Sequence, residues 1–397
     1  TLSRAAMGDA THARVSLVAE RDAFLLCTTP NGVAVHQGGR IFCTGPNPSE
    51  VFVPGMEMAT TFSVPAPRDG RTYWAAWHVE SQRLTVCSCD LGICKYNYRR
   101  APRERWGEYR GAEMLDYTLT TWDTVHNRVV DERVVHSVTD WPWPLGFLLK
   151  VWACGDTVWM AFVATDVRPN HQEVTFEVTL VHYVPGKSDE ATLVRLPPFL
   201  NSIQGLSVSE ESGHVAILSR AYHVGDGRHK GVLHFYDVQR RRMVTVDGTD
   251  RHSSRDAVLV SPSGASMVLL CCAMPWLEVT VYTRETEDEG MLGWTKSKRS
   301  SLSEISHGMT HDATNLVAEA FSPCGSRALF LFHSWLDLDA SGILVVDLVK
   351  TEHSHQVETE WHDWHPDHVP SQVAWSEDGF FVRSAQDGGV LRVGLAA

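Results

Sequence analysis

The densest group of potential metal ligands in this chain is a short aromatic and histidine-rich segment. It is Trp361-His362-Asp363-Trp364-His365-Pro366-Asp367-His368, and His353 and His355 precede it. A zinc site needs about four nitrogen, sulfur or oxygen donors in a tetrahedral array. Because Pro366 opposes a helix, the three histidines at steps of three converge only if the loop folds back. We therefore expect a packed or solvated loop, with a metal-binding or enzymatic use of the His353–His368 region as an alternative.

Three cysteines form a second candidate for metal chemistry. Cys87 and Cys89 would share one face of a strand, and Cys94 follows them. The chain has no matching second pair, so the strong zinc signature is missing and we expect free thiols. The total of nine cysteines is odd and scattered, and Cys271-Cys272 is typical of small buried side chains in a strand. This usage favours a reducing, intracellular compartment, either cytoplasmic or nuclear.

Motifs for nucleophilic or nucleotide chemistry are missing from the sequence. There is no Gly-x-Ser-x-Gly elbow, no Walker loop and no Gly-x-Gly-x-x-Gly after a strand. Carboxylate pairs such as Asp337 and Asp339 are ordinary solubilising groups in a chain with net charge −13. These observations predict a protein that is not an enzyme and needs no cofactor.

The charge balance and the apolar runs exclude two further classes of function. Nucleic-acid binding needs a concentrated basic face, and the one dense basic run, Arg240-Arg241-Arg242, is interpreted as a solvated turn. No apolar run approaches the ~18 residues of a membrane helix. Charged residues interrupt any apolar segment near Arg4 and Asp9, so we expect no signal peptide. The expected partners are therefore neither nucleic acid nor membrane.

The elements that must position all these residues are short strands. Helical periodicity is nearly absent, and β-branched and aromatic runs alternate with clusters of glycine, proline, aspartate and asparagine. A polar turn recurs between apolar runs at Ser261-Pro262-Ser263-Gly264, Ser322-Pro323-Cys324-Gly325 and Ser376-Glu377-Asp378-Gly379. Its interval is about 55 residues, which is typical of a propeller blade with four strands.

A second marker gives the number of blades. One strand per unit tends to end in an aromatic or β-branched residue followed by a polar one, as in Trp122-Asp123, Tyr236-Asp237 and Val346-Asp347. The complete series predicts seven third-strand ends, with six to eight blades left open: positions 90, 123, 184, 237, 283, 347 and 394. The chain ends after a third strand, so we expect Ala13–Ala19 to supply the missing fourth strand and remove exposed edges.

The pattern resembles the WD40 repeat family, most clearly over residues 200–397. That family's blade opens with a histidine, and here His252, His311 and His368 stand eight to eleven residues before the serine of each turn. The resemblance implies that these histidines form hydrogen bonds within their own blades. Only Trp122-Asp123 is a literal Trp-Asp pair, so the resemblance is to a divergent member with long blades. We expect one domain over residues 1–397, with its core at 10–397 and a loop insertion at 95–115.

The tryptophans carry the functional prediction. There are 14, and several stand outside the apparent strands. On a WD40-like blade they fall in the two classes of loop that emerge on one face, either to pack between blades or to form a partner surface. The predicted protein-binding residues are Trp141, Trp143, Tyr222, Trp276, Trp335, Trp361 and Trp364.

We therefore predict an all-β fold, a single propeller of about seven four-stranded blades closed by the N-terminal strand. Its predicted function is a scaffold for protein–protein interaction, gripping a protein or peptide partner with the aromatic loop face. Acidic rim residues would select a basic or mixed partner. The alternatives are a structural subunit of a large multi-subunit complex, and a propeller enzyme or metal-binding protein.

Overall fold

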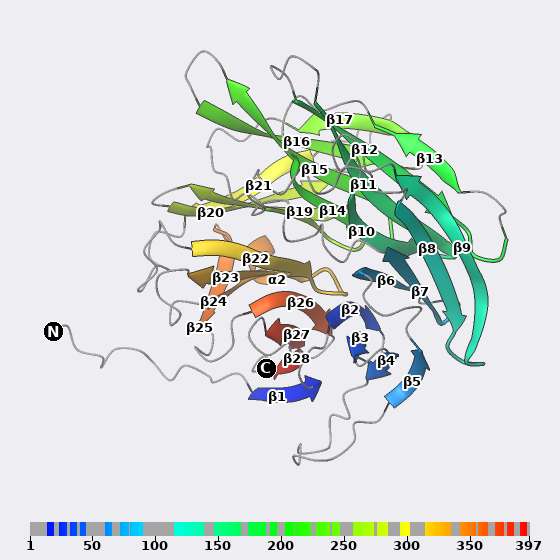
Figure 1. Cartoon of the computed structure of the whole chain (residues 1–397). Coiled ribbons are helices and arrows are strands. Elements are labelled where there is room, and N and C mark those ends of the chain that lie inside the picture. Colours follow the sequence, from blue (N-terminus) through cyan, green and yellow to red (C-terminus); the bar gives the residue numbers. More distant parts are fainter. Residues whose placement is uncertain are drawn as a thin grey trace, which may run out of the picture.

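The computed structural model consists almost entirely of antiparallel β-sheet (Figure 1). It describes residues 14–19, 24–29, 32–37, 40–44, 60–65, 72–78, 80–89, 115–138, 147–167, 174–187, 191–196, 203–209, 211–223, 228–238, 240–246, 257–273, 276–284, 294–301, 314–334, 342–354, 356–363, 370–376, 379–384 and 390–394. Among them, no helix has the length and apolar character that crossing a membrane requires.

The described strands form seven sheets of four strands, which we call blades 1 to 7 in chain order. Blade 1 contains β2 (Phe24–Thr29), β3 (Gly32–Gln37), β4 (Arg40–Thr44) and β5 (Thr60–Pro65). Blade 2 contains β6 (Thr72–His78), β7 (Arg83–Cys89), β8 (Leu115–Asp123) and β9 (Arg128–Val138). Blade 3 contains β10 (Phe147–Cys154), β11 (Thr157–Val167), β12 (Val174–Tyr183) and β13 (Thr192–Arg195).

The remaining blades repeat the same order. Blade 4 contains β14 (Ile203–Ser209), β15 (His214–His223), β16 (Arg228–Asp237) and β17 (Arg242–Val246). Blade 5 contains β18 (Ala257–Val260), β19 (Ser266–Ala273), β20 (Trp276–Arg284) and β21 (Trp294–Ser301). Blade 6 contains β22 (Thr314–Phe321), β23 (Arg327–Ser334), β24 (Gly342–Asp347) and β25 (Glu358–Asp363), with the short helix α2 (Leu348–His353) after β24.

Blade 7 is completed by the two ends of the described chain. It contains β26 (Pro370–Ser376), β27 (Gly379–Ser384) and β28 (Val390–Gly394), and β1 (Arg14–Ala19) adds its fourth strand. The strands β1 and β28 run antiparallel, with Val15 opposite Val393 and Leu17 opposite Leu391 (Figure 1). The first strand of each blade contacts that of the next, and β2 of blade 1 contacts β26 of blade 7. This confirms a propeller joined by its N-terminal strand.

The seven blades confirm most of the predicted third-strand ends. The third strands of blades 2, 4 and 6 end at Asp123, Asp237 and Asp347, as predicted. Those of blades 3, 5 and 7 end at or beside the predicted positions 184, 283 and 394. The position at 90 is wrong, because Cys89 ends β7, the second strand of blade 2, and the third strand of blade 1 ends at Thr44. The predicted insertion at 95–115 lies outside the described residues, except that β8 begins at Leu115.

The hydrophobic core is divided among the gaps between blades. Along β19, Met267 and Leu269 pack between blades 4 and 5, whereas Val268 and Leu270 pack between blades 5 and 6. Successive side chains of a strand point to opposite faces, so each blade buries both of its faces against its neighbours. This explains why the central strands are continuous apolar runs rather than alternating ones, for example the fully buried β18.

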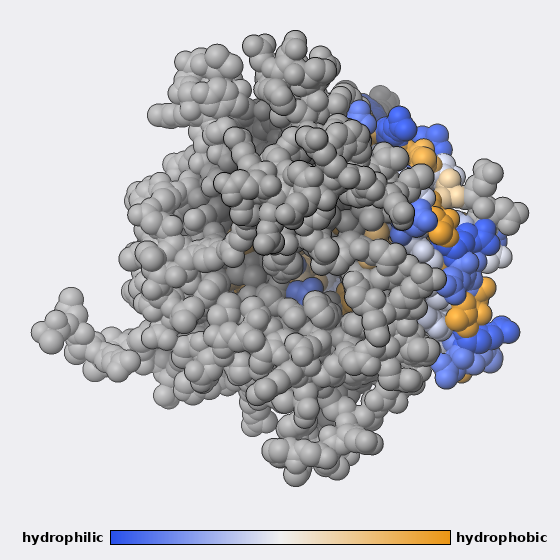
Figure 2. Space-filling model, in the orientation of Figure 1, coloured by the Kyte–Doolittle hydropathy of each residue, from blue (hydrophilic) through white to orange (hydrophobic). Residues whose placement is uncertain are grey.

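The rim over blades 2 and 3 is mixed in character. Figure 2 shows apolar residues there as separate spots among hydrophilic ones. Val125, Val129, Val134 and Leu193 are about half exposed or more. Single exposed apolar side chains of this kind are normal on protein surfaces, and they do not by themselves indicate a binding site. The outer strand β9 has register shifts in its pairing with β8, which discourage another strand from adding to this edge.

The β1–β28 pairing predicts a specific effect of shortening the chain. A variant that begins after Ala19 loses the fourth strand of blade 7 and exposes the edge of β28. Because a net contribution of about 0.5–1.5 kcal/mol accompanies each intramolecular hydrogen bond, we expect unfolding to require on the order of 3 kcal/mol less. Chemical denaturation measures the loss, and size-exclusion chromatography detects self-association through the open edge. A variant that begins at Ala13 is the control, and equal stability of the two would contradict the closure.

Candidate functional site

The two ends of the blades differ in how they are connected. The first and third strands of a blade run parallel, so the turns that follow them lie at the same end. We call this end the turn face. The connections between second and third strands, and between one blade and the next, lie at the opposite end, which we call the loop face. The described turns of blades 2 to 6 belong to the turn face.

The recurring serine-glycine signature forms the first turn of blades 5 and 6. In blade 5, the Ser266 backbone N–H donates to Ser261 Oγ (3.0 Å), and the Gly264 N–H donates to the Ser261 carbonyl (2.8 Å). Blade 6 repeats the pattern around Ser322, which accepts from the N–H of Arg327 at 2.9 Å. Gly264 and Gly325 both have φ of 72°, where a side chain is disfavoured. The signature therefore encodes a serine-capped turn with a left-handed residue.

These turns pack against the turn of the preceding blade. A Cβ placed on Gly264 would lie 2.4 Å from Ser212 Oγ and 3.0 Å from His214 Nδ1 in blade 4. Gly325 of blade 6 lies in the same relation to blade 5, but its nearest atoms there belong to Ser261 and Pro262, at 3.6 and 3.7 Å. Glycine is thus required at Gly264 by space as well as by backbone conformation, so this turn is the tighter joint.

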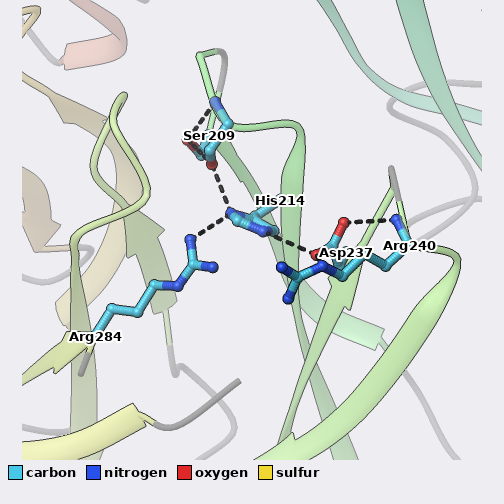
Figure 3. A network of polar contacts seen from close by, with 6 residues as sticks. Ser209, His214, Asp237, Arg240 and Arg284 are labelled. Atoms are coloured by element: carbon cyan, nitrogen blue, oxygen red, sulfur yellow. Dashed lines mark hydrogen bonds and ion pairs between the residues drawn. The ribbon is translucent and has the colours of Figure 1, made fainter. Parts of the chain in front are cut away.

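A polar network crosses the joint between blades 4 and 5 (Figure 3). Ser209 Oγ donates to the Pro262 carbonyl of blade 5, and the Glu211 N–H donates to the same carbonyl at 3.1 Å. Ser212 Oγ lies 2.6 Å from Ser209 Oγ and 2.6 Å from His214 Nδ1. The turn of blade 4 is therefore tied directly to the backbone of blade 5.

His214 is the centre of this network. Its Nε2 lies 3.4 Å from Asp237 Oδ2, and both side chains are buried. Arg284 of blade 5 approaches from the other side, with Nη1 3.5 Å from His214 Nδ1 (Figure 3). A guanidinium can only donate, so the Arg284 contact requires the tautomer in which Nδ1 is unprotonated and the Nε2–H is directed at Asp237. Burial, together with the charge of Arg284, lowers the pKa of His214 despite the opposing effect of Asp237.

The network contains Ser212, His214 and Asp237 in the arrangement of a catalytic Ser-His-Asp triad, but its surroundings do not suit catalysis. Gly264 covers the Ser212 hydroxyl so closely that even a Cβ at that position would clash with it. A substrate carbonyl needs to approach the attacking oxygen to about 3–3.5 Å. The network therefore acts as a structural joint between blades. Motif searches could not find it, because its members come from separate turns of two blades.

Blade 2 is joined to blade 3 by a related contact. His78, at the end of β6, has Nδ1 2.9 Å from the Gly155 carbonyl in the first turn of blade 3. Its Nε2 lies 2.9 Å from Thr85 Oγ1, and Thr85 Oγ1 lies 2.8 Å from Thr121 Oγ1. Burial is the main cause of the lowered pKa of His78. The predicted blade-opening histidines His252, His311 and His368 lie outside the described residues.

The predicted aromatic anchors are only partly within the described structure. Tyr222 lies near the end of β15 and Trp276 begins β20, so both belong to strands rather than to loops as expected. The strands of blades 4 and 5 extend further than their sequence pattern indicated, and both residues flank the connection between second and third strands. The other loop tryptophans lie outside the described residues: Trp141, Trp143, Trp335 and Trp364.

Trp361 also differs from the expectation of a loop. It lies in β25, pairs with Leu344 of β24, and its ring centroid is 5.8 Å from that of Phe332. A Cβ on Gly342 would lie 1.9 Å from Trp361 Cζ2. The absent side chain of Gly342 makes room for the indole, which packs against the core between blades 5 and 6. This packing explains why Trp361 belongs to a strand.

The two groups of residues that the sequence offers for metal binding lie only partly within the described structure. Cys87 and Cys89 share a face of β7 as predicted, and both side chains are buried in the core between blades 2 and 3 without a disulfide bond. His353 lies in α2, whereas His362 lies in β25 and His365 lies outside the described residues. Within the described ranges, no group of three or more histidine, cysteine, aspartate or glutamate side chains is arranged to hold a metal ion.

Comparison with known proteins supports the fold. No family model matches the sequence, and no curated protein matches it either. The β-propeller domain of Cps50 (Swd1) from Myceliophteria thermophila has a TM-score of 0.54 at 8% identity, covering 97% of this chain and 100% of that domain. A complex of KlAtg21 with the coiled coil of AgAtg16 gives 0.52 at 10% identity, with 96% and 95% covered. A chain of the mitotic checkpoint complex gives 0.51 at 8% identity, with 97% and 95% covered. The chain therefore has a divergent WD40-like β-propeller fold.

The turn contacts predict different costs for two equivalent substitutions. Gly325→Ala forces a side chain into the left-handed region, which costs about 1–2 kcal/mol. Gly264→Ala carries the same cost. Its new methyl group also displaces Ser212 and His214 of blade 4, which adds about 1–3 kcal/mol. Urea denaturation of both variants measures the difference. Equal losses for the two would show that the close approach between blades 4 and 5 does not contribute.

His214 predicts an acid-sensitive stability. Because its folded pKa is lowered, the unfolded chain takes up a proton first as the pH falls below about 6.5. The stability that the lowered pKa of His214 contributes is therefore fully present above about pH 6.5, and it is lost as the pH falls towards the folded pKa. We expect His214→Gln to reduce the decline in unfolding free energy between about pH 7.5 and about pH 5.5. Thermal unfolding of both proteins across this pH range measures the decline. An unchanged decline in the variant would exclude His214 as a cause of the acid sensitivity. The other buried histidines, such as His78, leave a residual slope.

Proposed function

We propose that this chain is a non-catalytic scaffold for protein–protein interaction and that its loop face grips a protein or peptide partner. The observation that supports the proposal most is a repeated placement of aromatic residues. Tyr222 lies near the end of the second strand of blade 4, and Trp276 begins the third strand of blade 5. Trp335 follows directly after β23, the second strand of blade 6. Three consecutive blades thus carry an aromatic residue at the same connection.

The blade order brings these positions towards one another. Blades 4, 5 and 6 are neighbours, and their first strands β14, β18 and β22 contact one another in sequence. Equivalent positions on neighbouring blades therefore lie at the same end of adjacent sheets. Aromatic side chains bury large areas with few rotatable bonds, which makes them effective anchors in interfaces. We expect a partner lying across blades 4 and 5 to contact Tyr222 and Trp276, and Trp335 to extend this surface towards blade 6.

The charge of the chain supports a particular kind of partner. With 48 acidic and 35 basic side chains, the chain attracts basic or mixed surfaces and repels strongly acidic ones over long distances. Complementary charge of this type increases association rates and selects among partners more than it increases affinity. The aromatic anchors would provide most of the binding energy, and the acidic rim would provide selection.

The nature of the structural neighbours agrees with this proposal. One is a protein bound to a coiled coil, and another is part of a checkpoint complex. A propeller presents many loops on a rigid frame, and this suits binding without chemistry. On the turn face, the one described serine beside a histidine and an aspartate is covered by Gly264, which favours a non-catalytic role.

The test is a quantitative affinity capture with the double variant Trp276→Ala and Trp335→Ala. We expect partners recovered with the wild-type chain to fall at least about tenfold, since interface tryptophans each contribute about 2 kcal/mol or more. The matched control is Val125→Ser with Val349→Ser, which removes two exposed apolar side chains of the turn face, one from the turn after β8 and one from helix α2. Partners retained by the tryptophan variant, or lost equally by the control, would contradict binding through the loop face.

A further inference from the structure

A cluster of arginines stands on the turn face between blades 3, 4 and 5. Arg240 and Arg241 lie in the turn from β16 to β17, Arg242 begins β17, and Arg284 ends β20 of the next blade. We call these four residues the arginine cluster. The three consecutive arginines are all exposed, and the side chain of Arg240 is 50% exposed. The cluster concentrates positive charge on a chain whose net charge is −13.

The side chains of Arg240 and Arg284 approach the joint at His214. Arg284 and Arg240 lie on opposite sides of the His214–Asp237 pair (Figure 3). Met243 packs between blades 3 and 4 and Val244 packs between blades 4 and 5. Strand alternation therefore places Arg242 on the face of β17 that looks towards blade 5, the blade of Arg284. The cluster thus belongs to two blades that the polar network holds together.

Arg241 lies on the other side of the turn. Its charge lowers the pKa of His182 in blade 3, although burial of the imidazole is the larger cause. The cluster therefore extends from blade 3 to blade 5 across the turn of blade 4. Asp237 is buried beside it, with Oδ2 3.9 Å from Arg240 Nε, and Glu211 is an exposed acidic residue in the first turn of the same blade.

The backbone of Arg241 has a conformation that is unusual for arginine. Its φ is 52°, in the left-handed region that favours glycine and asparagine. The equivalent turn of blade 2 has the same design, because Asp123 accepts the N–H of His126 just as Asp237 accepts that of Arg240. There the left-handed position is Asn127, with φ of 50°. An arginine held where asparagine fits better points to a use for its side chain.

The chemistry of the cluster favours an oxygen anion. A guanidinium presents a planar fork of donors that matches a carboxylate or a phosphate group, and it keeps its charge when partly desolvated. The lowered pKa values of His182 and His214 favour the neutral imidazole, so the positive charge of the cluster comes from its arginines. The rigid joint holds guanidinium groups of two blades near one another, which reduces the ordering cost of binding.

We propose that the arginine cluster binds a short acidic segment of a partner protein, through its carboxylate or phosphate oxygens. Nucleic acid and anionic membranes carry extended negative charge, which the net charge of −13 repels. A short segment meets only the local patch, because charges more than about 8 Å away are largely screened at physiological salt. The proposed surface is on the opposite end of the blades from the aromatic loop face, and it does not depend on that face binding anything.

The test measures fluorescence anisotropy of labelled short peptides mixed with the full chain. The probes are a glutamate-rich peptide, a phosphoserine peptide and a glutamine-rich peptide of equal length. We expect one or both acidic peptides to bind and the glutamine peptide not to bind, with affinity falling as salt is raised. The glutamate and phosphoserine arms distinguish the two sources of the anion. No binding of either acidic peptide would overturn the proposal, as would tighter binding of duplex DNA or phosphatidylserine vesicles.

The decisive variant is Arg241→Asn, which gives blade 4 the residue that blade 2 uses in the same conformation. We expect its melting temperature to be equal or higher, while peptide affinity falls at least about fivefold and the salt dependence weakens. A combined Arg240→Ala and Arg241→Asn variant should lower the affinity further. A lower melting temperature with unchanged affinity would show that Arg241 is structural and would overturn the proposal.

Two control variants complete the experiment. Lys187→Ala with Lys350→Ala removes two exposed positive charges of the same face, each of which already contacts one aspartate. This control should leave peptide affinity within about twofold of the wild type. The Trp276→Ala and Trp335→Ala variant should bind the acidic peptide normally, so failure of the loop-face proposal and failure of this one are distinguishable. A loss of affinity in the lysine control equal to that of Arg241→Asn would indicate a general charge effect and would overturn a specific cluster.

Discussion

The structure depends on the burial of both faces of each blade. A single blade cannot cover itself, since Met267 and Val268 of one strand require opposite neighbours. Seven blades satisfy this need by surrounding an axis, and the first strands contact one another from β2 round to β26. The same requirement explains the pairing of β1 with β28, because the last sheet would otherwise leave an unpaired edge.

Packing between blades also determines how the polar turns are built. Where two blades approach most closely, Gly264 replaces any side chain and lies against Ser212 and His214. The buried His214 and Asp237 pair with one another within the joint. These groups would suggest a hydrolase if they were considered without their surroundings. Because Gly264 covers the serine, these groups form a structural contact between blades 4 and 5.

The two proposed surfaces use this rigid frame in different ways. On the loop face, we propose that aromatic residues at equivalent connections of blades 4 to 6 bind a partner through their apolar area. On the turn face, Arg241 occupies a strained position that Asn127 fills in blade 2, and it adds charge beside a joint that is already fixed. Each surface draws residues from several blades, and each offers a different chemistry. A scaffold with both would hold one partner through apolar anchors and another through an acidic segment.

The sequence by itself determined the architecture. Turn signatures such as Ser261–Gly264, and strand ends such as Asp123, Asp237 and Asp347, predicted the repeat, its seven blades and the strand that completes the last one. These features are local, because short-range turn chemistry and strand alternation produce them. The one wrong strand end, at position 90, arose because Cys89 ends a second strand, and local pattern cannot say which neighbour a strand pairs with. Only the tertiary structure decided that Trp361 fills the space beside Gly342, that Gly264 covers Ser212, and that Arg284 joins the arginines of another blade. Such contacts join residues far apart in the chain, and the close packing of one blade against the next brings them together.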